Sequence, residues 1–181
     1  MFKTNVIQKF KGLIPFITYQ NINKESILTF SKDYLLFNFK FLKNHVSYQY
    51  TVLSCISGVD LIEKSYRFCI SYDLLSLVFN TRLRVKVFVD KIATVKSINS
   101  IFINSNWWER EVWDLFGIFF VNHPDLRRIL TDYGFEGHPL RKDFPLSGYI
   151  ELRYDIIKKR MISEPLELSQ EFRSFTFEMP W

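Results

Sequence analysis

The sequence predicts an α+β fold: a small antiparallel or mixed sheet with packed helices, followed by a long extended C-terminal segment. Apolar and basic residues alternate along residues 82–89, as in a strand with one buried face. Within residues 34–44, apolar side chains recur at helical spacing and form one face, made of Leu35, Leu36, Phe39 and Leu42. After residue 121 this periodicity disappears, and glycine and proline become frequent. A stretch of that kind is usually functional or held by another surface.

The strands of the predicted sheet follow one another with few breaking residues between them. The segment "SILTF" (26–30) is a short apolar stretch, and "YQYTVLSCISG" (48–58) reads as a strand ended by its glycine. The runs "RFCISYDLLSLVF" (67–79) and "RLRVKVFVD" (82–90) are separated by two residues, which predicts a hairpin. One face of the second run is apolar and the other basic, with Leu83, Val85, Val87 and Val89 on the first and Arg82, Arg84 and Lys86 on the second.

We divide the chain into an N-terminal segment (1–25), a compact α+β domain (26–121) and an extended C-terminal region (122–181). The N-terminal segment carries lysines and has no acid before Glu25, which is compatible with a transit peptide, but it lacks arginine and a secretory apolar core. The last residues are too apolar for a free tail, so we expect them to lie against a partner or to fold back on the domain. These apolar residues are Leu166, Leu168, Phe172, Phe175, Phe177 and Trp181.

Composition excludes several classes of protein. The longest apolar run, residues 115–121, is far short of the roughly 20 residues that a membrane-spanning helix needs. Two cysteines, Cys55 and Cys69, cannot supply four thiolates to an iron–sulfur cluster, and they read as small buried side chains in a reducing compartment. A single alanine, Ala93, stands beside abundant Phe, Ile, Asn and Lys. This bias follows AT-rich codons and indicates an organellar gene, which would need no import signal.

Charge is distributed unevenly along the chain. Residues 1–100 hold 14 Lys or Arg against 6 Asp or Glu, whereas residues 101–181 hold 10 against 13. Two interpretations of the basic half are a solvated surface and a surface complementary to an acidic partner. A third is an RNA-binding module that uses the sheet face of Arg82, Arg84 and Lys86. Retention on RNA that falls steeply as salt rises would single out the RNA-binding interpretation.

The stretch "NWWEREVWDLFGIFF" (106–120) predicts a helix over residues 107–116. Asn106 followed three residues later by Glu109 fits a capping box, and Gly117 suits a left-handed stop. One face of this helix, which we expect to point toward the core, is made of Trp108, Val112, Leu115 and Phe116.

Two interpretations of the charged side chains on this helix need no other protein. A metal-dependent or acid–base enzyme would use Glu111, Asp114 and His123, although no two histidines of the chain have helical ligand spacing. A structural interpretation instead makes Glu109 a cap and pairs Arg110 with Asp114, four residues on, in a modest ion pair.

A third interpretation makes the helix a joint whose charges are buried against arginines. The cations would be Arg127 and Arg128 of this chain, pointing in different directions, or arginines of a partner. Pro124, just before them in "HPDLRRIL" (123–130), is suited to the first position of a helical turn. The segment 131–149 that follows contains no phosphate-binding loop, nucleophile motif or nucleotide fingerprint.

From about residue 106 onward the chain closely resembles the 30 kDa subunit family of respiratory complex I. The resemblance is carried by "EREVWDLFGIFFVNHPDLRRIL" (109–130), "TDYGFEGHPLRKDFPLSGYIELRYD" (131–155) and "EPLELSQEFRSF" (164–175), and it extends more weakly upstream. It implies an interface role for the motif residues Glu109, Arg110, Glu111, Asp114, His123, Pro124, Asp125, Arg127, Arg128, His138, Arg141, Lys142, Asp143 and Arg173.

The resemblance implies a subunit of the hydrophilic, matrix-side arm of the proton-translocating NADH:ubiquinone oxidoreductase, peripheral to the mitochondrial inner membrane. It implies no catalytic centre, metal or cofactor in this chain, although the host complex uses FMN and iron–sulfur clusters, and no nucleic-acid partner. The implied partners are chiefly the large 49 kDa subunit of the quinone site and the small subunit that carries the terminal iron–sulfur cluster. We therefore interpret the chain as a non-redox structural and assembly subunit that holds the quinone-site module together.

Overall fold

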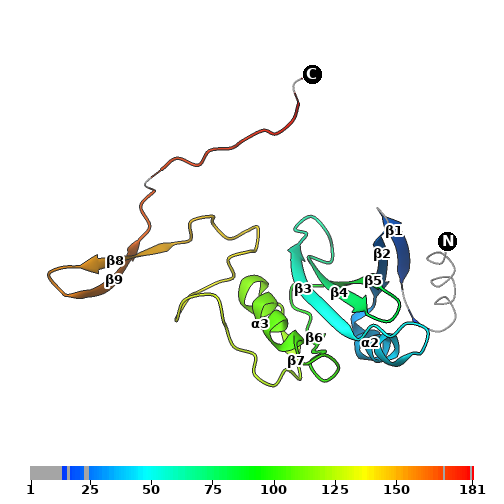
Figure 1. The fold of residues 1–181 in the computed structure, drawn as a ribbon. Coiled ribbons are helices and arrows are strands. Elements are labelled where there is room, and N and C mark those ends of the chain that lie inside the picture. Colours follow the sequence, from blue (N-terminus) through cyan, green and yellow to red (C-terminus); the bar gives the residue numbers. More distant parts are fainter. Residues whose placement is uncertain (1–13, 16, 23–24, 169, 180) are drawn as a thin grey trace. The chain divides into compact units, whose positions relative to one another are not determined.

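The structure is a computed structural model that describes residues 14–15, 17–22, 25–168, 170–179 and 181. It divides into two compact units, one ending at Lys142 and the other beginning at Asp143, and each is described by itself (Figure 1). We expected the compact domain to end near residue 121. The first unit runs on to Lys142 because residues 122–142 are hydrogen-bonded to the preceding helix. Among the described residues there is no helix with the length and apolar character needed to span a bilayer.

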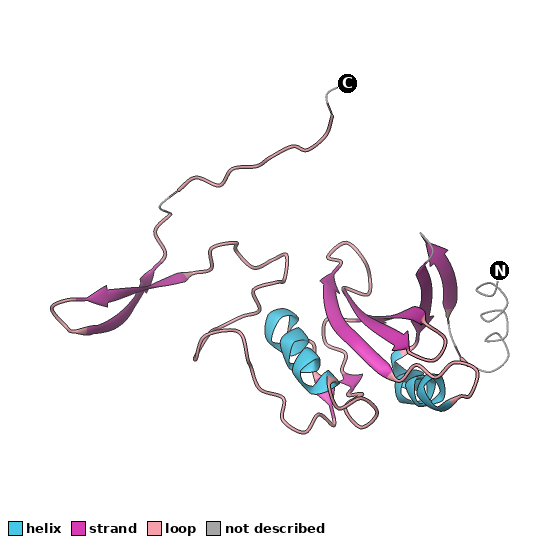
Figure 2. Cartoon of the chain, viewed as in Figure 1, coloured by secondary structure: helices cyan, strands magenta, loops and turns pink. Residues whose placement is uncertain are grey.

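A five-stranded mixed sheet forms the centre of the first unit. Its strands are β1 (Thr18–Ile22), β2 (Glu25–Phe30), β3 (Val52–Asp60), β4 (Phe68–Ser76) and β5 (Thr81–Val89). They lie in the order β1-β2-β5-β4-β3. The pair β2 and β5 runs parallel, whereas the other three pairs are antiparallel. Together with the two described helices, this mixed sheet confirms the predicted α+β class (Figure 2).

The predicted hairpin of β4 and β5 is present, and its two faces differ as expected. Val85 and Val87 of β5 are fully buried, whereas Lys86 between them is only half-buried. The expected two-residue connection is wrong, because β4 ends at Ser76 and residues 77–80 form the turn. Asn80 closes that turn in the left-handed region, with φ of 46°, which asparagine tolerates better than most residues.

Two helices cover the apolar face of the sheet. The described residues of the first unit also form the 3-10 turn η2 (Lys32–Tyr34), α2 (Leu35–Asn44), α3 (Ser105–Phe116) and the short parallel strands β6 (Val95–Lys96) and β7 (Phe120–Val121). Phe39 of α2 meets Tyr72 of β4 edge to face, with ring centroids 5.0 Å apart. Phe116 of α3 lies over Gly58, where an added Cβ would come within 2.7 Å of the ring. Glycine at this position therefore lets α3 approach the sheet closely.

Helix α3 begins earlier than predicted and lacks the predicted capping box. Its N-cap is Asn104, whose side chain makes no cap hydrogen bond but donates to the carbonyl of Leu53 at 2.7 Å. Glu109 points into the core instead of back to the helix start. The predicted stop is confirmed, because Gly117 is left-handed, with φ of 75°, and its N–H donates to the carbonyl of Trp113. The predicted apolar face is also confirmed, since the core includes or is bordered by Trp108, Val112, Leu115 and Phe116.

The second unit contains a two-stranded antiparallel hairpin that the sequence analysis missed. Its strands are β8 (Ile150–Asp155) and β9 (Arg160–Pro165). None of its side chains is fully buried, although apolar and charged residues alternate along 150–155, a strand pattern that the sequence analysis did not recognise. Beyond it, residues 166–168 and 170–179 have neither helix nor strand, and large apolar side chains there are exposed, among them Phe177 at 94%.

Candidate functional site

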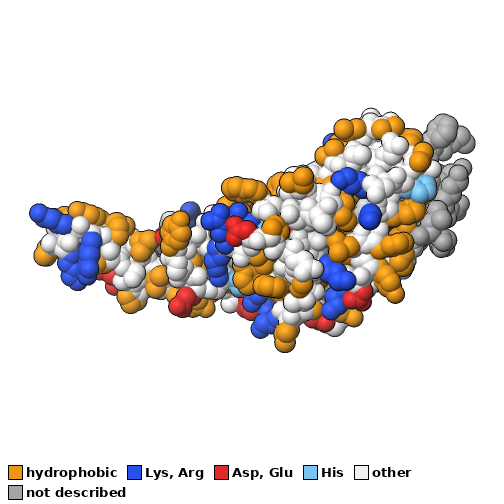
Figure 3. All heavy atoms as spheres, turned by 90° about the horizontal axis from the view of Figure 1, so that it is seen from below, with side chains coloured by type: hydrophobic (Ala, Val, Ile, Leu, Met, Phe, Trp, Pro, Cys, Tyr) orange, Lys and Arg blue, Asp and Glu red, His pale blue; other side chains and the backbone are white. Residues whose placement is uncertain are grey.

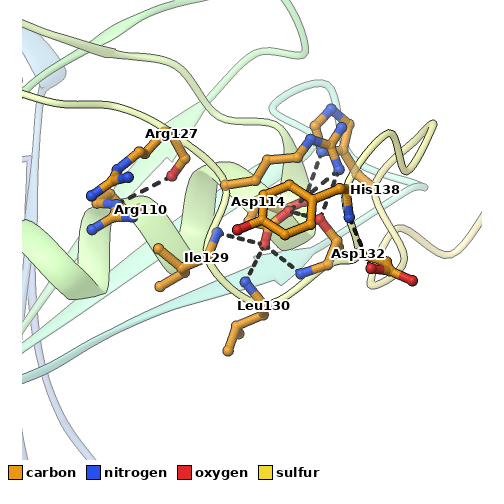
Figure 4. A network of polar contacts seen from close by, with 10 residues as sticks. Arg110, Asp114, Arg127, Ile129, Leu130, Asp132 and His138 are labelled. Atoms are coloured by element: carbon orange, nitrogen blue, oxygen red, sulfur yellow. Dashed lines mark hydrogen bonds and ion pairs between the residues drawn. The ribbon is translucent and has the colours of Figure 1, made fainter.

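Asp114 is the centre of a polar network that joins α3 to the loop after β7 (Figure 4). Its side chain is fully buried. One carboxylate oxygen, Oδ2, accepts the backbone N–H groups of Ile129, Leu130 and Thr131 at 3.2, 2.8 and 2.9 Å. The other, Oδ1, accepts the hydroxyl of Thr131 at 2.6 Å. A carboxylate that receives three successive backbone donors fixes the path of the loop itself.

Arg128 supplies the positive charge that faces Asp114, with Nη1 3.3 Å from Oδ1. The predicted ion pair between Arg110 and Asp114 is wrong. Arg110 donates from Nε to the carbonyl of Arg127 at 3.2 Å, and its guanidinium lies over the ring of Trp107. The reason is that the loop and Arg128 already occupy the carboxylate oxygens of Asp114.

The loop after β7 has no helical character of its own. Residues 122–131 contain no helix, so the helical turn expected at Pro124 is wrong. Three consecutive N–H groups that a helix would have paired with its own carbonyls donate to Asp114 instead. Burial alone would raise the pKa of the Asp114 carboxyl, but the hydrogen bonds from Thr131, Leu130 and Ile129 outweigh it and hold the pKa below its usual value. The observed loop conformation therefore depends on the ionised form of the Asp114 carboxylate.

The C-terminal end of α3 is closed by a second segment of the loop. Arg141 donates from Nε to the carbonyl of Phe116 at 2.6 Å and from Nη2 to that of Gly117 at 3.4 Å. A cation that binds the last carbonyls also meets the negative end of the helix dipole. His138 lies beside it, with Nδ1 2.9 Å from the carbonyl of Asp114. Because a carbonyl can only accept, Nδ1 carries the proton, and burial lowers the pKa of the His138 ring so that it stays neutral near pH 7.

Asp60, at the end of β3, anchors the same segment, and the sequence analysis missed it. Arg67 donates to both of its carboxylate oxygens at 2.9 Å. The backbone N–H of Lys142 donates to Oδ2, also at 2.9 Å. The hydrogen bond from Arg67 is the main cause that lowers the pKa of the Asp60 carboxyl. No local pattern marked this aspartate, because its partner Lys142 lies far along the chain.

Glu109 is buried, and its hydrogen-bond partners belong to a different segment from those of Asp114. Its Oε2 accepts the hydroxyl of Ser97 at 2.6 Å, and its Oε1 accepts the N–H of Ile98 at 2.8 Å. Burial raises the pKa of the Glu109 carboxyl to about 7, although these hydrogen bonds act in the opposite direction. The ring of His123 lies 3.8 Å from Oε2, and burial lowers the pKa of that ring.

Several charged residues of the predicted set remain at least partly exposed. Arg127 is 70% exposed and pairs with the exposed Asp125 at 2.9 Å. Glu111 is half-buried, and its carboxylate has no hydrogen bond or ion pair among the described residues. Trp107 is 68% exposed with the guanidinium of Arg110 against its ring. An exposed tryptophan beside arginines has the composition of binding hot spots at protein interfaces.

The structure places the predicted site residues in two groups. All of those from Glu109 to Lys142 lie in the first unit, where Pro124 and Lys142 are exposed. Asp143 and Arg173 lie in the second unit and are also exposed.

The two other interpretations are not favoured by the geometry. Glu111, Asp114 and His123 are not brought together, and the described residues contain no cluster of His, Cys, Asp or Glu side chains that could hold a metal ion. On the sheet face expected to be basic, Arg84 lies 2.7 Å from Asp73 and 3.0 Å from Glu25. These carboxylates neutralise much of the charge that an RNA backbone would need.

Comparison with known proteins decides the family. The family described as "Respiratory-chain NADH dehydrogenase, 30 Kd subunit" matches residues 28–150, most of the chain. The chain belongs to this family. It is a subunit of an oxidoreductase complex, complex I of the respiratory chain, and its partners are other subunits of that complex.

Individual relatives of this 30 kDa family cover most of the same length. The chain is 60% identical over 142 residues to NADH-ubiquinone oxidoreductase subunit 9 of Reclinomonas americana, covering 78% of this chain and 70% of that protein. It is 56% identical over 149 residues to NADH dehydrogenase [ubiquinone] iron-sulfur protein 3 of Solanum tuberosum, covering 82% and 78%.

One solved structure shares the fold of this 30 kDa family member. A chain of the membrane-bound sulfane sulfur reductase, an archaeal respiratory membrane complex, superposes with a TM-score of 0.66 at 20% identity. The match covers 78% of this chain and 84% of that one. At this level of identity the likeness concerns the fold alone.

Proposed function

We propose that this chain is a non-redox structural and assembly subunit of the hydrophilic arm of NADH:ubiquinone oxidoreductase, which holds the quinone-site module together. Its direct partners in this proposal are the large 49 kDa subunit and the small subunit with the terminal iron–sulfur cluster. Electron transfer and proton translocation then belong to the host complex. This chain contributes the rigid joint at α3 and the exposed C-terminal unit.

The observation that carries the proposal is how the charged residues of α3 are used. Asp114 and Glu109 are fully buried, and their carboxylate oxygens accept hydrogen bonds from backbone and side-chain groups of this same chain. A carboxylate committed in this way fixes a surface and does not act on a substrate. By contrast, the second unit exposes large apolar side chains, including Phe175 at 65% and Trp181 at 93%. Surfaces of that composition normally face another protein.

The same proposal assigns no cofactor to this chain. The two cysteines, Cys55 and Cys69, lie on neighbouring strands, with Cys55 opposite Asp73 and Cys69 four residues before Asp73 in β4. At ~3.3 Å per strand residue the two thiols are about 13 Å apart along the sheet. They are too far apart to ligate one cluster together, since cluster ligands surround a single small centre.

We place the protein at the mitochondrial inner membrane, on the matrix side, as a peripheral subunit encoded by an organellar gene. The support is the biased composition, with one alanine in the whole chain, and the resemblance to relatives named as subunit 9.

Native-gel separation of gently solubilised mitochondrial membranes tests the proposal. The band is stained in the gel for NADH dehydrogenase activity, probed for this chain and analysed by mass spectrometry. Co-migration with a very large, active band that also holds the 49 kDa subunit is the expected result. Migration near the 21.8 kDa of the chain itself, apart from that activity, would overturn it.

A further inference from the structure

The β8–β9 hairpin has two faces of opposite character. One face is uncharged and mostly apolar, and its ladder pairs are Ile150 with Pro165, Leu152 with Ser163 and Tyr154 with Met161. The other face is ionic: Arg153 donates to both carboxylate oxygens of Glu164, at 3.0 and 2.6 Å. The four large apolar side chains on the first face are almost equally exposed, at 55 to 59%. This face is therefore an apolar surface that no described residue covers fully, whereas the only apolar side chain among the described residues of the other face is the half-buried Ile162.

A two-stranded hairpin of this size needs something to cover its apolar face. Isolated two-stranded hairpins are marginally stable at best in water, and stable ones gain a third strand or pack against another element. The ion pair between Arg153 and Glu164 is exposed, so it contributes little to holding the strands together. Both observations indicate that this hairpin is completed by another surface.

The turn of the hairpin adds a charge signature. Residues 156–160 read Ile-Ile-Lys-Lys-Arg, and all five are exposed. Asp155, the nearest acid, is occupied by the turn itself, since its Oδ1 accepts the N–H groups of Ile157 at 2.8 Å and Lys158 at 3.3 Å. Figure 3 shows Lys and Arg side chains gathered at the free end of the hairpin, at the left of the view. A surface that receives this end should therefore be acidic.

We propose that the apolar face of the β8–β9 hairpin docks on another subunit of the same complex, on an apolar surface bordered by carboxylates at the hairpin turn. This inference rests on the proposed function and adds which face is buried and what chemistry receives it. Six strand residues at ~3.3 Å span about 20 Å. Such a narrow face is a minor part of a standard interface, in which each partner buries ~800 Å². The hairpin thus acts as one element of a larger contact.

A pair of matched substitutions tests which face is buried. Leu152→Glu places a carboxylate on the apolar face, and Ile162→Glu places the same group on the ionic face, next to Arg153 across the ladder. Each variant is expressed in place of the wild-type chain, and the amount in the large active band is measured against total chain. We expect Leu152→Glu to lower the assembled fraction at least threefold, whereas Ile162→Glu stays within a factor of about 1.5 of wild type.

The outcomes separate this inference from the proposed function. If the assembled fraction falls equally for the two variants, or for neither, the apolar face is not the buried one. This result would not affect the finding that the wild-type chain is in the complex. Failure of the wild-type chain to co-migrate with the active band would instead overturn the proposed function.

Zero-length carbodiimide cross-linking of the intact complex tests the acidic partner surface. This reagent joins a lysine amine directly to a carboxylate in contact with it. We expect cross-linked peptides that join Lys158 or Lys159 to Asp or Glu of a different subunit. Cross-links found only within this chain, or only to a second copy of it, would overturn the proposed occupant. The absence of any cross-link, as expected for a turn that lies at a lipid surface, would overturn it as well.

Discussion

Nε2 of His123 lies 3.8 Å from Oε2 of Glu109, and both side chains are completely removed from solvent. The neighbours of the ring decide its tautomer. Nδ1 accepts the N–H of Asp125 at 3.1 Å, so the proton is on Nε2, which is 3.2 Å from the carbonyl of Asn106. The ring is thus neutral and tied to the loop and to α3 at once. Glu109 beside it is the group that titrates near neutral pH.

Glu109 should make the stability of the chain fall as pH rises from about 4.5 to about 7. Its carboxyl has a pKa of about 7 when folded against an ordinary value of 4.5, so the folded chain binds one more proton in that interval. The stabilisation is fully present below pH 4.5 and is lost as pH rises through 7. The difference corresponds to about 3 kcal/mol. Urea unfolding between pH 5 and 8, followed by tryptophan fluorescence, should show a flatter profile for Glu109→Gln than for wild type.

Glu111→Gln is the control for this pH measurement, because it removes a half-buried carboxylate from the same helix. It should retain the wild-type loss of stability between pH 5 and 7. If Glu109→Gln and wild type run parallel over that interval, the buried carboxyl is not the source of the pH dependence.

Asp114→Ala should release the loop that follows β7. The substitution removes the acceptor of three backbone N–H groups, of the Thr131 hydroxyl and of the Arg128 guanidinium, and removing one partner of such a network costs roughly 3–5 kcal/mol. Asp132→Ala is the matched control, since the side chain of that exposed aspartate accepts, within the described part of the chain, a single hydrogen bond from the N–H of Tyr133.

Limited proteolysis and urea unfolding would check the prediction for Asp114. New cleavage between residues 128 and 134 in Asp114→Ala, but not in Asp132→Ala, is expected. Because the pKa of Asp114 is held below its ordinary value of 3.8, the wild-type loop should itself be lost as pH falls through and below that value. A loop of Asp114→Ala as resistant as that of wild type would contradict the role of Asp114 as its anchor.

Substitution of two glycines with the same backbone conformation distinguishes the cost of backbone strain from the cost of steric overlap. Gly117 and Gly134 have φ of 75° and 73°. A Cβ at Gly134 meets nothing within 4 Å, whereas one at Gly117 would overlap the guanidinium of Arg141 and the ring of His138. Gly134→Ala should therefore cost about 1–2 kcal/mol, for the left-handed conformation alone. Gly117→Ala should cost at least ~2 kcal/mol more, because Arg141 must leave the helix end. Equal midpoints of urea unfolding would show that Arg141 does not close the helix.

Local patterns were sufficient to predict much of the fold. The alternation in β5 predicted its two faces, and the apolar spacing of α2 predicted three of the residues that it buries, because both patterns are imposed by a single core; the buried Asn38 was not predicted. Gly117 predicted the end of α3 for a different and purely local reason: its positive φ suits glycine. The β8–β9 hairpin was missed although residues 150–155 alternate apolar and charged side chains, because the surrounding segment is rich in glycine and proline and was interpreted as extended throughout.

The site was harder to predict than the fold, because its contacts join residues far apart in sequence. Asp114 was singled out correctly, but spacing along one helix indicated Arg110 as its partner, whereas Arg128 reaches it from the loop. Glu109 fits a capping box by spacing, yet Ser97 and Ile98 of another segment bind it. Sequence spacing reports contacts within an element, and these contacts form between elements.

Arg127 and Arg128 are adjacent, and the structure gives them different expected effects on the complex. Arg128 is partly buried against Asp114, so Arg128→Ala should destabilise the isolated chain. Arg127 is exposed and pairs with exposed Asp125, a contact worth ~1 kcal/mol at most for stability. Arg127→Ala should therefore leave urea unfolding of the chain nearly unchanged while lowering the amount of assembled complex.

Glu111→Ala should behave like Arg127→Ala, because its half-buried carboxylate has no hydrogen bond or ion pair among the described residues. Native gels give the assembled fraction, and NADH:quinone activity divided by that fraction gives turnover per complex. We expect the assembled fraction to fall more than turnover for both variants. Normal assembly with slow turnover would instead assign Arg127 and Glu111 to electron or proton transfer, because a residue that acts only through assembly cannot slow the complexes that have formed.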